Sequence, residues 1–162
     1  MDRKTFQNKC RKITKELIKK SFPELKKKRV LVFVPLFFRK AYSGLALWIP
    51  PFPRMLFLNK ERSTESDSFL RGLLSHELGH QSLHFMRGLK KSIILASLYW
   101  LSKKVRRKEE DEANKLIIRR GYARDIYATT KRLEKIKTCG GIQKYYMSSE
   151  EIKSYAKKIG KW

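Results

Sequence analysis

The chain has 162 residues, of which 39 are lysine or arginine and 15 are aspartate or glutamate, giving a formal net charge of +24. This length supports one hydrophobic core and excludes two independent ones. The charge surplus predicts a polyanionic partner, such as nucleic acid, an anionic membrane surface or an acidic protein, and says nothing about the fold.

The start of the chain and its cysteines indicate the compartment. No apolar segment of a secretory signal follows Met1, and no apolar run approaches the roughly 20 residues of a transmembrane helix. The two cysteines, Cys10 and Cys139, lie far apart in the sequence, which favours reduced thiols. We therefore expect a soluble cytoplasmic protein.

Residues 1–28 are predicted to form a basic amphipathic helix that ends near Pro23. Lysine and arginine fill most of its positions, and apolar residues recur at helical spacing at Phe6, Cys10, Ile13 and Leu17. We expect this stripe to pack the helix on the domain. The alternative is a helix that binds a membrane or nucleic acid.

Branched and aromatic residues predict three short strands next, at residues 30–38, 41–49 and 55–58, separated by glycine and proline. They favour a small antiparallel or mixed sheet packed on a helical core, and therefore the α+β class. Residues 55–59 are the candidate for the free edge of that sheet.

The sequence His-Glu-Leu-Gly-His at residues 76–80 lies in a predicted helix that begins after N-cap candidates at residues 66–68 and ends near Phe85. Histidines four apart project from nearly the same side of a helix, about 6 Å apart along its axis. His76 and His80 can therefore bind one zinc ion, with Glu77 placed to take a proton from a metal-bound water. The alternative is a pair of packed core histidines without a metal.

The residues around the two histidines predict a central helix. Apolar residues lie on opposite sides of it, which is typical of a buried helix. Gly72 and Gly79 share a strip where another element can approach closely. His84 follows one turn after His80, and we expect a helix-end residue there and not a fourth ligand, because a catalytic zinc ion keeps one position open.

Residues 92–101 are apolar nearly all round and are flanked by lysine pairs at 90–91 and 103–104. Ten residues in a helix cannot cross a bilayer core about 30 Å thick. We expect a buried helix here, and the alternative is a segment that lies in a membrane interface.

The acidic cluster at residues 109–112 contains the predicted third metal ligand. One face of a helix that begins here would carry Glu110, Ala113, Asn114, Ile117 and Gly121. Choosing Glu109 instead would turn further charged side chains toward the core. We therefore predict Glu110 as the ligand and Asn114 as a hydrogen-bond partner of a ligand histidine. The alternative is a solvated acidic helix terminus.

Two more helices are predicted after Gly121. Residues 122–137 are amphipathic, residues 138–141 read as a loop, and Ser148 with Glu151 forms a capping box that opens the last helix. Tyr122 is the candidate for stabilising an oxyanion at the zinc site, and the alternative is an arginine nearby.

The order of these motifs resembles a known family. His76-Glu77-x-x-His80 followed by Glu110-x-x-Ala113-Asn114 is similar to the gluzincin metallopeptidases, whose third ligand is a glutamate on a second helix. Within them it most resembles the minigluzincins, soluble relatives of the membrane proteases that act in heat shock and prenyl-protein processing. The resemblance spans roughly residues 45–137. Residues 76–84 are also similar to repressor-cleaving proteases of the ImmA/IrrE type.

The resemblance implies a zinc-dependent endopeptidase with one zinc ion per chain, held by His76, His80 and Glu110. It implies that a sheet edge pairs with an extended peptide or protein substrate. Residues 1–162 would form one metallopeptidase domain, with a catalytic core at 30–137 after the N-terminal helix. The tail at 138–162 would cover the cleft and keep the enzyme latent.

Two other functions fit the sequence. One is a regulatory protease that cleaves a single partner, such as a transcriptional repressor. The other is a basic nucleic-acid-binding protein with a structural zinc site that has no open position. A homodimer is compatible with either function.

Overall fold

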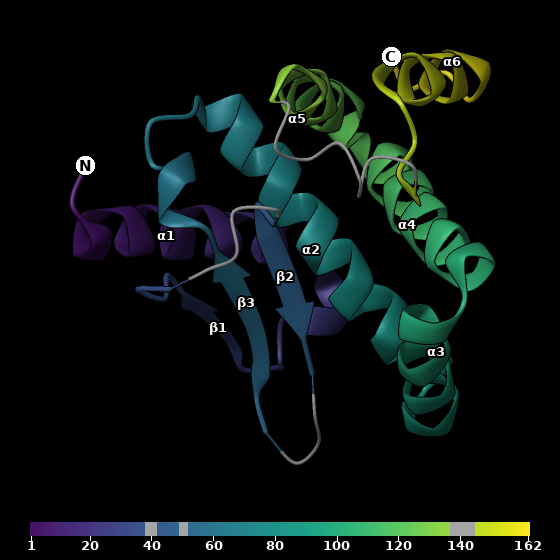
Figure 1. Cartoon of the computed structure of the whole chain (residues 1–162), viewed down its shortest axis with the longest axis horizontal. Helices are drawn as coiled ribbons and strands as arrows, with labels where there is room; N and C mark the ends of the chain where they lie inside the picture. Colours follow the sequence, from purple (N-terminus) through teal and green to yellow (C-terminus); the bar gives the residue numbers. More distant parts are fainter. Residues whose placement is uncertain (38–41, 49–51, 137–144) are drawn as a thin grey trace.

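A three-stranded mixed sheet lies beside a set of helices in the computed structural model, which describes residues 1–37, 42–48, 52–136 and 145–162 (Figure 1). The strand order is β1–β3–β2, with β1 parallel and β2 antiparallel to the central strand. The strands are β1 (Val30–Phe33), β2 (Gly44–Leu47) and β3 (Arg54–Leu58). The predicted α+β class and small mixed sheet are confirmed.

The helices described are α1 (Arg3–Ser21), α2 (Asp67–Arg87), α3 (Leu89–Leu101), α4 (Lys103–Ile117), α5 (Ala123–Lys135) and α6 (Ser149–Lys158). Short 3-10 turns occur at Pro23–Leu25 and Lys60–Arg62, and a π-helical turn, η3 (Ile118–Tyr122), joins α4 to α5. Gly121 in this turn has a φ of 92°, a conformation that favours glycine.

The placement of residues 55–59 at the free edge of the sheet is wrong, because β3 is the central strand. Its backbone is bonded on both sides: the Arg54 amide donates to the Arg29 carbonyl and the Asn59 amide to the Ser43 carbonyl. Alternation of buried and half-buried residues occurs in central and edge strands alike, so the sequence did not reveal the strand order. The strand beside α2 is β2, which pairs only with β3 among the described residues.

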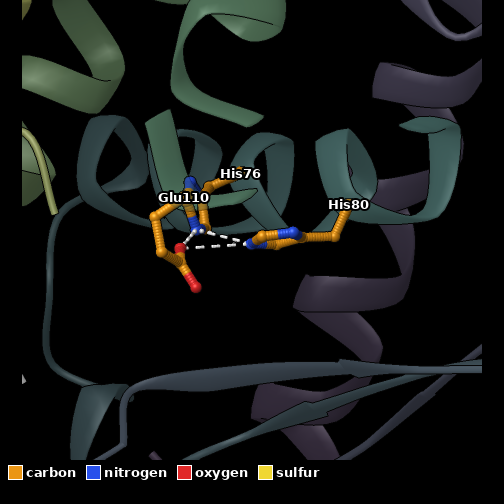
Figure 2. Close-up of side chains that lie close together, drawn as sticks. All are labelled: His76, His80 and Glu110. Atoms are coloured by element: carbon orange, nitrogen blue, oxygen red, sulfur yellow. Dashed lines mark hydrogen bonds and ion pairs between the residues drawn. The ribbon is translucent and has the colours of Figure 1, made fainter. Parts of the chain in front are cut away.

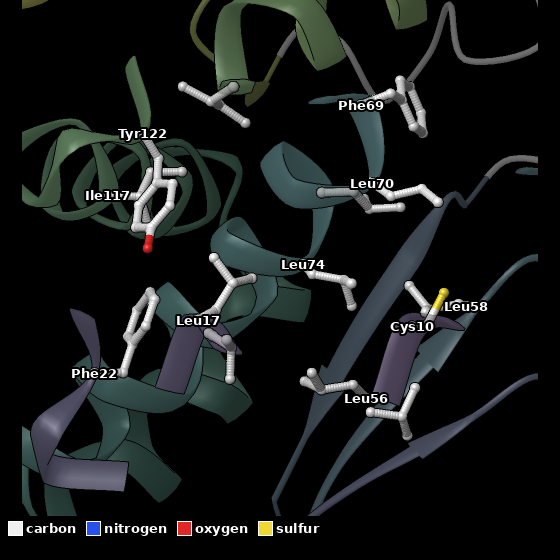
Figure 3. Packing of buried hydrophobic residues seen from close by; sticks show 14 of the residues in the cluster. Cys10, Leu17, Phe22, Leu56, Leu58, Phe69, Leu70, Leu74, Ile117 and Tyr122 are labelled. Carbon is white, nitrogen blue, oxygen red and sulfur yellow. The ribbon is translucent and has the colours of Figure 1, made fainter. Parts of the chain in front are cut away.

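Helix α1 packs on the domain through its apolar stripe, as predicted. Its N-terminus is capped by Asp2, whose carboxylate accepts hydrogen bonds from the Lys4 and Thr5 amides. The buried stripe meets the sheet and α2 in one core (Figure 3), which contains Phe6, Cys10, Leu17, Leu56, Leu58, Leu70 and Leu74. The stripe is therefore not free to bind a membrane or nucleic acid.

Helix α2 runs through the centre of the molecule, between the sheet and the helices that follow it (Figure 1). Ser66 caps it by accepting a hydrogen bond from the Phe69 amide. Buried residues occur on every side of the helix, so the predicted central helix is confirmed. At Gly72 it approaches α5, and at Gly79 it approaches α4, as the glycine strip predicted.

Helix α3 does not match the prediction of a buried helix. Only Ser92 is buried, whereas its large apolar side chains point into solvent: Leu89, Ile93, Ile94, Leu98, Trp100 and Leu101. Among the described elements its main neighbours are α4 and the end of α2 (Figure 1), too few to bury a surface that is apolar nearly all round. No described helix is long and apolar enough to span a membrane.

The C-terminal helix α6 is part of the core. The capping box is confirmed: Ser148 and Glu151 exchange the expected side chain to backbone hydrogen bonds. Ile152 and Ala156 are fully buried and join the core with Met147. The predicted loop at residues 138–141, which includes Cys139, lies outside the described residues.

The two glycines of α2 give a graded test of this packing. A methyl group on Gly72 would overlap Thr129 Oγ1 and the Asp125 carbonyl, whereas one on Gly79 would meet its nearest atoms at 3.1 and 3.3 Å. Despite a gain of about 1 kcal/mol in helix propensity, Gly72→Ala should lower the free energy of unfolding by about 2 kcal/mol. Gly79→Ala should change it by less than about 1 kcal/mol. Urea unfolding of the metal-free protein measures both, and equal effects would contradict the described packing.

Candidate metal centre

Three potential metal ligands from two helices converge on one point (Figure 2). His76 and His80 project from α2, and Glu110 projects toward them from α4. The Nε2 atoms of the histidines are 3.1 Å apart, and Glu110 Oε2 lies 3.0 Å from that of His76 and 3.2 Å from that of His80. The structure therefore brings together the three predicted ligands as a compact group that could bind a metal ion.

The approach of α4 to α2 at Gly79 positions this group. Ala113 and Ile117 of α4 lie directly against Gly79, which offers no side chain to hold them off. Glu110 is about one turn before Ala113 on the same face of α4, so its carboxylate reaches the histidines. Glu110 is only 2% exposed, so water cannot replace the histidines as partners of its carboxylate.

Two further side chains hold the ligands in place. His76 Nδ1 lies 2.9 Å from Asn114 Oδ1, an acceptor, so Nδ1 carries the proton and Nε2 presents its lone pair to the centre. The Tyr99 hydroxyl donates a 2.5 Å hydrogen bond to Glu110 Oε1. Asn114 is placed as predicted, whereas Tyr99 was missed because it lies in the apolar segment 92–101 and is brought to the site only by the packing of α3 on α4.

Glu110 and His80 each stabilise the charged form of the other. Burial alone would raise the pKa of Glu110, but the charge and hydrogen bond of His80, with the neighbouring His76, outweigh burial and hold it well below its usual range. Burial alone would lower the pKa of His80, but Glu110 outweighs it and raises the pKa to about 9. Without a metal ion, the site at neutral pH therefore contains a buried ion pair between His80 and Glu110.

Glu77 lies next to His76 on α2, and its side chain faces strand β2 of the sheet. It is 6% exposed, and burial, offset in part by His76 and His80, raises the pKa of its carboxyl. Its Oε1 would lie 2.7 Å from a Cβ atom at Gly44, so glycine at the start of β2 leaves room for the carboxylate. Glu77 thus lies between the potential ligands and the edge strand β2.

Two adjoining cavities meet at His76 and Glu77. One is bordered by β2 and α3, with Leu47, Tyr99 and Trp100 in its wall. The other extends along α5 to Met147. Together they form a groove that passes the potential ligands along β2, a shape suited to an extended molecule.

Tyr146 lies at this groove, whereas Tyr122 does not. The prediction of Tyr122 as an oxyanion stabiliser is wrong, because its ring stacks on Phe22 and its hydroxyl is 2.8 Å from Ser21 Oγ (Figure 3). The Tyr146 ring centre is 5.8 Å from that of His76, and Tyr146 borders both cavities. Sequence reasoning missed it, because no spacing connects the tail with the histidines.

Two neighbours of the site have other partners. Glu109 is also buried, but its carboxylate accepts hydrogen bonds from Arg87 at the end of α2 and not from the histidines. His84 lies apart from the three-residue group, and burial together with the charges of His80, Arg87 and Arg54 lowers its pKa to about 4. It is therefore neutral at physiological pH.

No protein-family model, curated protein or solved structure matches this chain. The function is therefore argued from the geometry of the site.

The adjacent buried glutamates of α4 allow a matched test of metal binding. Glu110→Gln should weaken the affinity for a divalent metal by at least about 100-fold, because it removes a ligand and its charge. Glu109→Gln changes charge and shape equally one residue away and should retain wild-type affinity, since Glu109 faces Arg87. Metal content after a brief chelator challenge distinguishes them, and equal loss in both variants would contradict the assignment.

The His80–Glu110 ion pair also predicts that metal binding releases a proton. With a pKa of about 9, the His80 imidazole is protonated at pH 7 in the metal-free protein, and it must be neutral to bind a metal. Calorimetric titration in buffers of different ionisation enthalpy should show about one proton released per metal ion at pH 7. The release should disappear as the pH rises through 9, and a pH-independent value would contradict it.

Proposed function

We propose that this protein is a zinc-dependent endopeptidase. The observation that carries the proposal is the position of Glu77, a buried carboxylate beside a His-His-Glu group and next to an edge strand. Such a set provides metal ligands, a general base and a surface for an extended peptide in one groove.

The donor set fits zinc. Two neutral imidazoles and one carboxylate are a ligand set of catalytic zinc sites, which keep a further position open. Zinc–ligand distances of about 2.0–2.1 Å place neighbouring ligands of a tetrahedral site roughly 3.3 Å apart, close to the 3.0–3.2 Å found among Nε2 of His76, Nε2 of His80 and Oε2 of Glu110. A structural zinc site would need another protein ligand, and no larger group occurs among the described residues.

Bound zinc would supply Lewis acidity, lowering the pKa of a water molecule and polarising a peptide carbonyl. Glu77 would take the proton of the attacking water and pass it to the leaving amine. The raised pKa of its buried carboxyl suits the first task, because it makes the carboxylate a stronger base toward the attacking water. Asn114 would keep the His76 ring oriented throughout.

The edge strand β2 supports a peptide as the substrate. One side of β2 pairs with β3, and its other side borders the groove at Glu77. An extended peptide added to this edge would bind through its backbone, and its side chains would enter the apolar parts of the groove near Leu45 and Leu47. The sequence predicted this substrate-pairing edge at residues 55–59, and we now assign it to β2.

The sequence pattern supports the same function. Glu110-x-x-Ala113-Asn114 resembles the second motif of gluzincins, and these residues make the contacts with α2 described above. The contact of Tyr146 with His76 supports a tail that narrows the groove in a latent form. A cytoplasmic location remains the expectation from the sequence.

The role of Glu77 is tested by Glu77→Gln, which keeps the shape of the side chain but cannot take a proton. Hydrolysis of unstructured peptides by the zinc-loaded protein should fall by about 100- to 10,000-fold, while zinc content stays at the wild-type level. Peptide products quantified by mass spectrometry measure the loss. The exposed Glu150 is a matched control, and Glu150→Gln should hydrolyse normally. Undiminished hydrolysis by Glu77→Gln would refute the assigned role.

A further inference from the structure

Helix α3 presents an apolar face that no described element covers. The exposed fraction of six of its large apolar side chains ranges from 39% at Leu98 to 83% at Leu101, whereas Leu95 and Tyr99 are half-buried. They spread over about half of the circumference, and the other half carries Tyr99, whose hydroxyl donates to Glu110 of α4. At the end of α2, Phe85 and Met86 are also exposed. Contiguous apolar patches of this kind mark interaction sites in globular proteins.

We propose that α3 docks this protein on the surface of anionic phospholipid membranes. The helix would lie in the plane of the interface with its apolar side chains among the acyl chains. The proposal goes beyond peptide hydrolysis and does not depend on it.

The charges around α3 favour an anionic membrane as the partner. Exposed lysine pairs flank the helix at both ends: Lys90 with Lys91, and Lys103 with Lys104. No acidic residue occurs between Glu77 and Glu109 in the sequence. Nearby Arg87 and Arg107 are engaged by carboxylates, whereas the four lysines form no ion pair with any described residue. Their ammonium groups are thus available to lipid phosphates.

The dimensions of α3 agree with a helix on the membrane and not across it. Its 13 residues extend about 20 Å, less than the roughly 30 Å of a bilayer core. Near its C-terminal end, Tyr99 and Trp100 are in edge contact, and the Arg106 guanidinium lies 5.1 Å and 5.7 Å from their ring centres. Aromatic and basic groups together are typical of residues at the level of lipid headgroups.

Docking through α3 would bring the groove to the membrane surface. Leu95, Ala96 and Tyr99 border the cavity that contains His76, His80 and Glu110. The same helix therefore supplies the lipid-facing side chains on its outer side and a wall of the groove on its inner side. Substrates at the membrane surface would therefore have the shortest path to the groove.

Co-sedimentation of the full chain with vesicles tests the proposal. Wild-type protein should bind vesicles of phosphatidylcholine mixed with phosphatidylglycerol and bind pure phosphatidylcholine weakly. The double substitution Ile94→Gln with Leu101→Gln should reduce binding to mixed vesicles by at least about tenfold, because two apolar side chains no longer enter the bilayer. Leu36→Gln with Phe37→Gln is the matched control; these apolar residues are even more exposed, in the segment after β1, and binding should be unchanged.

A second pair of variants separates docking from general charge attraction. Lys103→Glu with Lys104→Glu, next to α3, should weaken binding far more than Lys12→Glu with Lys15→Glu, an equal charge change on the exposed side of α1. Equal losses in both pairs would overturn the proposal in favour of diffuse electrostatic attraction. Absence of vesicle binding by the wild type would also overturn it. A dimer that Ile94→Gln with Leu101→Gln dissociates, without vesicle binding, would assign the face to a second copy of the chain.

Discussion

The close contact of α2 and α4 at Gly79 is the constraint on which the site depends. Because Gly79 has no side chain, Ala113 and Ile117 reach the backbone of α2, and Glu110 is carried to the two histidines. A residue larger than alanine there would separate the helices and the ligands together. The same contact places Asn114 against His76. The distance between α2 and α4 thus sets both the packing of the core and the positions of the potential ligands. A close-packed hydrophobic core fixes that distance more firmly than polar contacts alone.

Burial of so many ionisable groups in one place needs a reason. His76, Glu77 and Glu110 are nearly inaccessible to solvent, and two carboxylates share the region with two imidazoles. Burying a charge is costly unless it is paired, and breaking a buried pair is costlier still. In the metal-free protein the His80–Glu110 pair provides partial compensation. On the proposed function, a divalent cation would compensate Glu110 and bind the His80 imidazole in its neutral form, which would offset the cost of keeping the group in the core.

Local sequence patterns predicted the features that depend on a single helix or a single helix cap. The apolar stripe of α1, the Ser66 cap, the glycines of α2 and the shared face of Glu110 and Asn114 all follow from spacing, and the structure contains each of them. Features that depend on distant packing were missed. The alternation of buried and half-buried residues in β3 would be the same in a central or an edge strand, so it did not reveal the strand order. The composition of α3 did not reveal that few elements pack against it. Tyr146 reaches His76 only through the fold of the tail.

Anomalous diffraction from crystals of the zinc-loaded protein tests the central claim most directly. We expect one zinc peak at ligand distance from His76 Nε2, His80 Nε2 and Glu110 Oε2, with a non-protein oxygen at a further position and Glu77 outside the coordination shell. A peak elsewhere, or one completed by a further side chain of the protein, would contradict a catalytic metal centre.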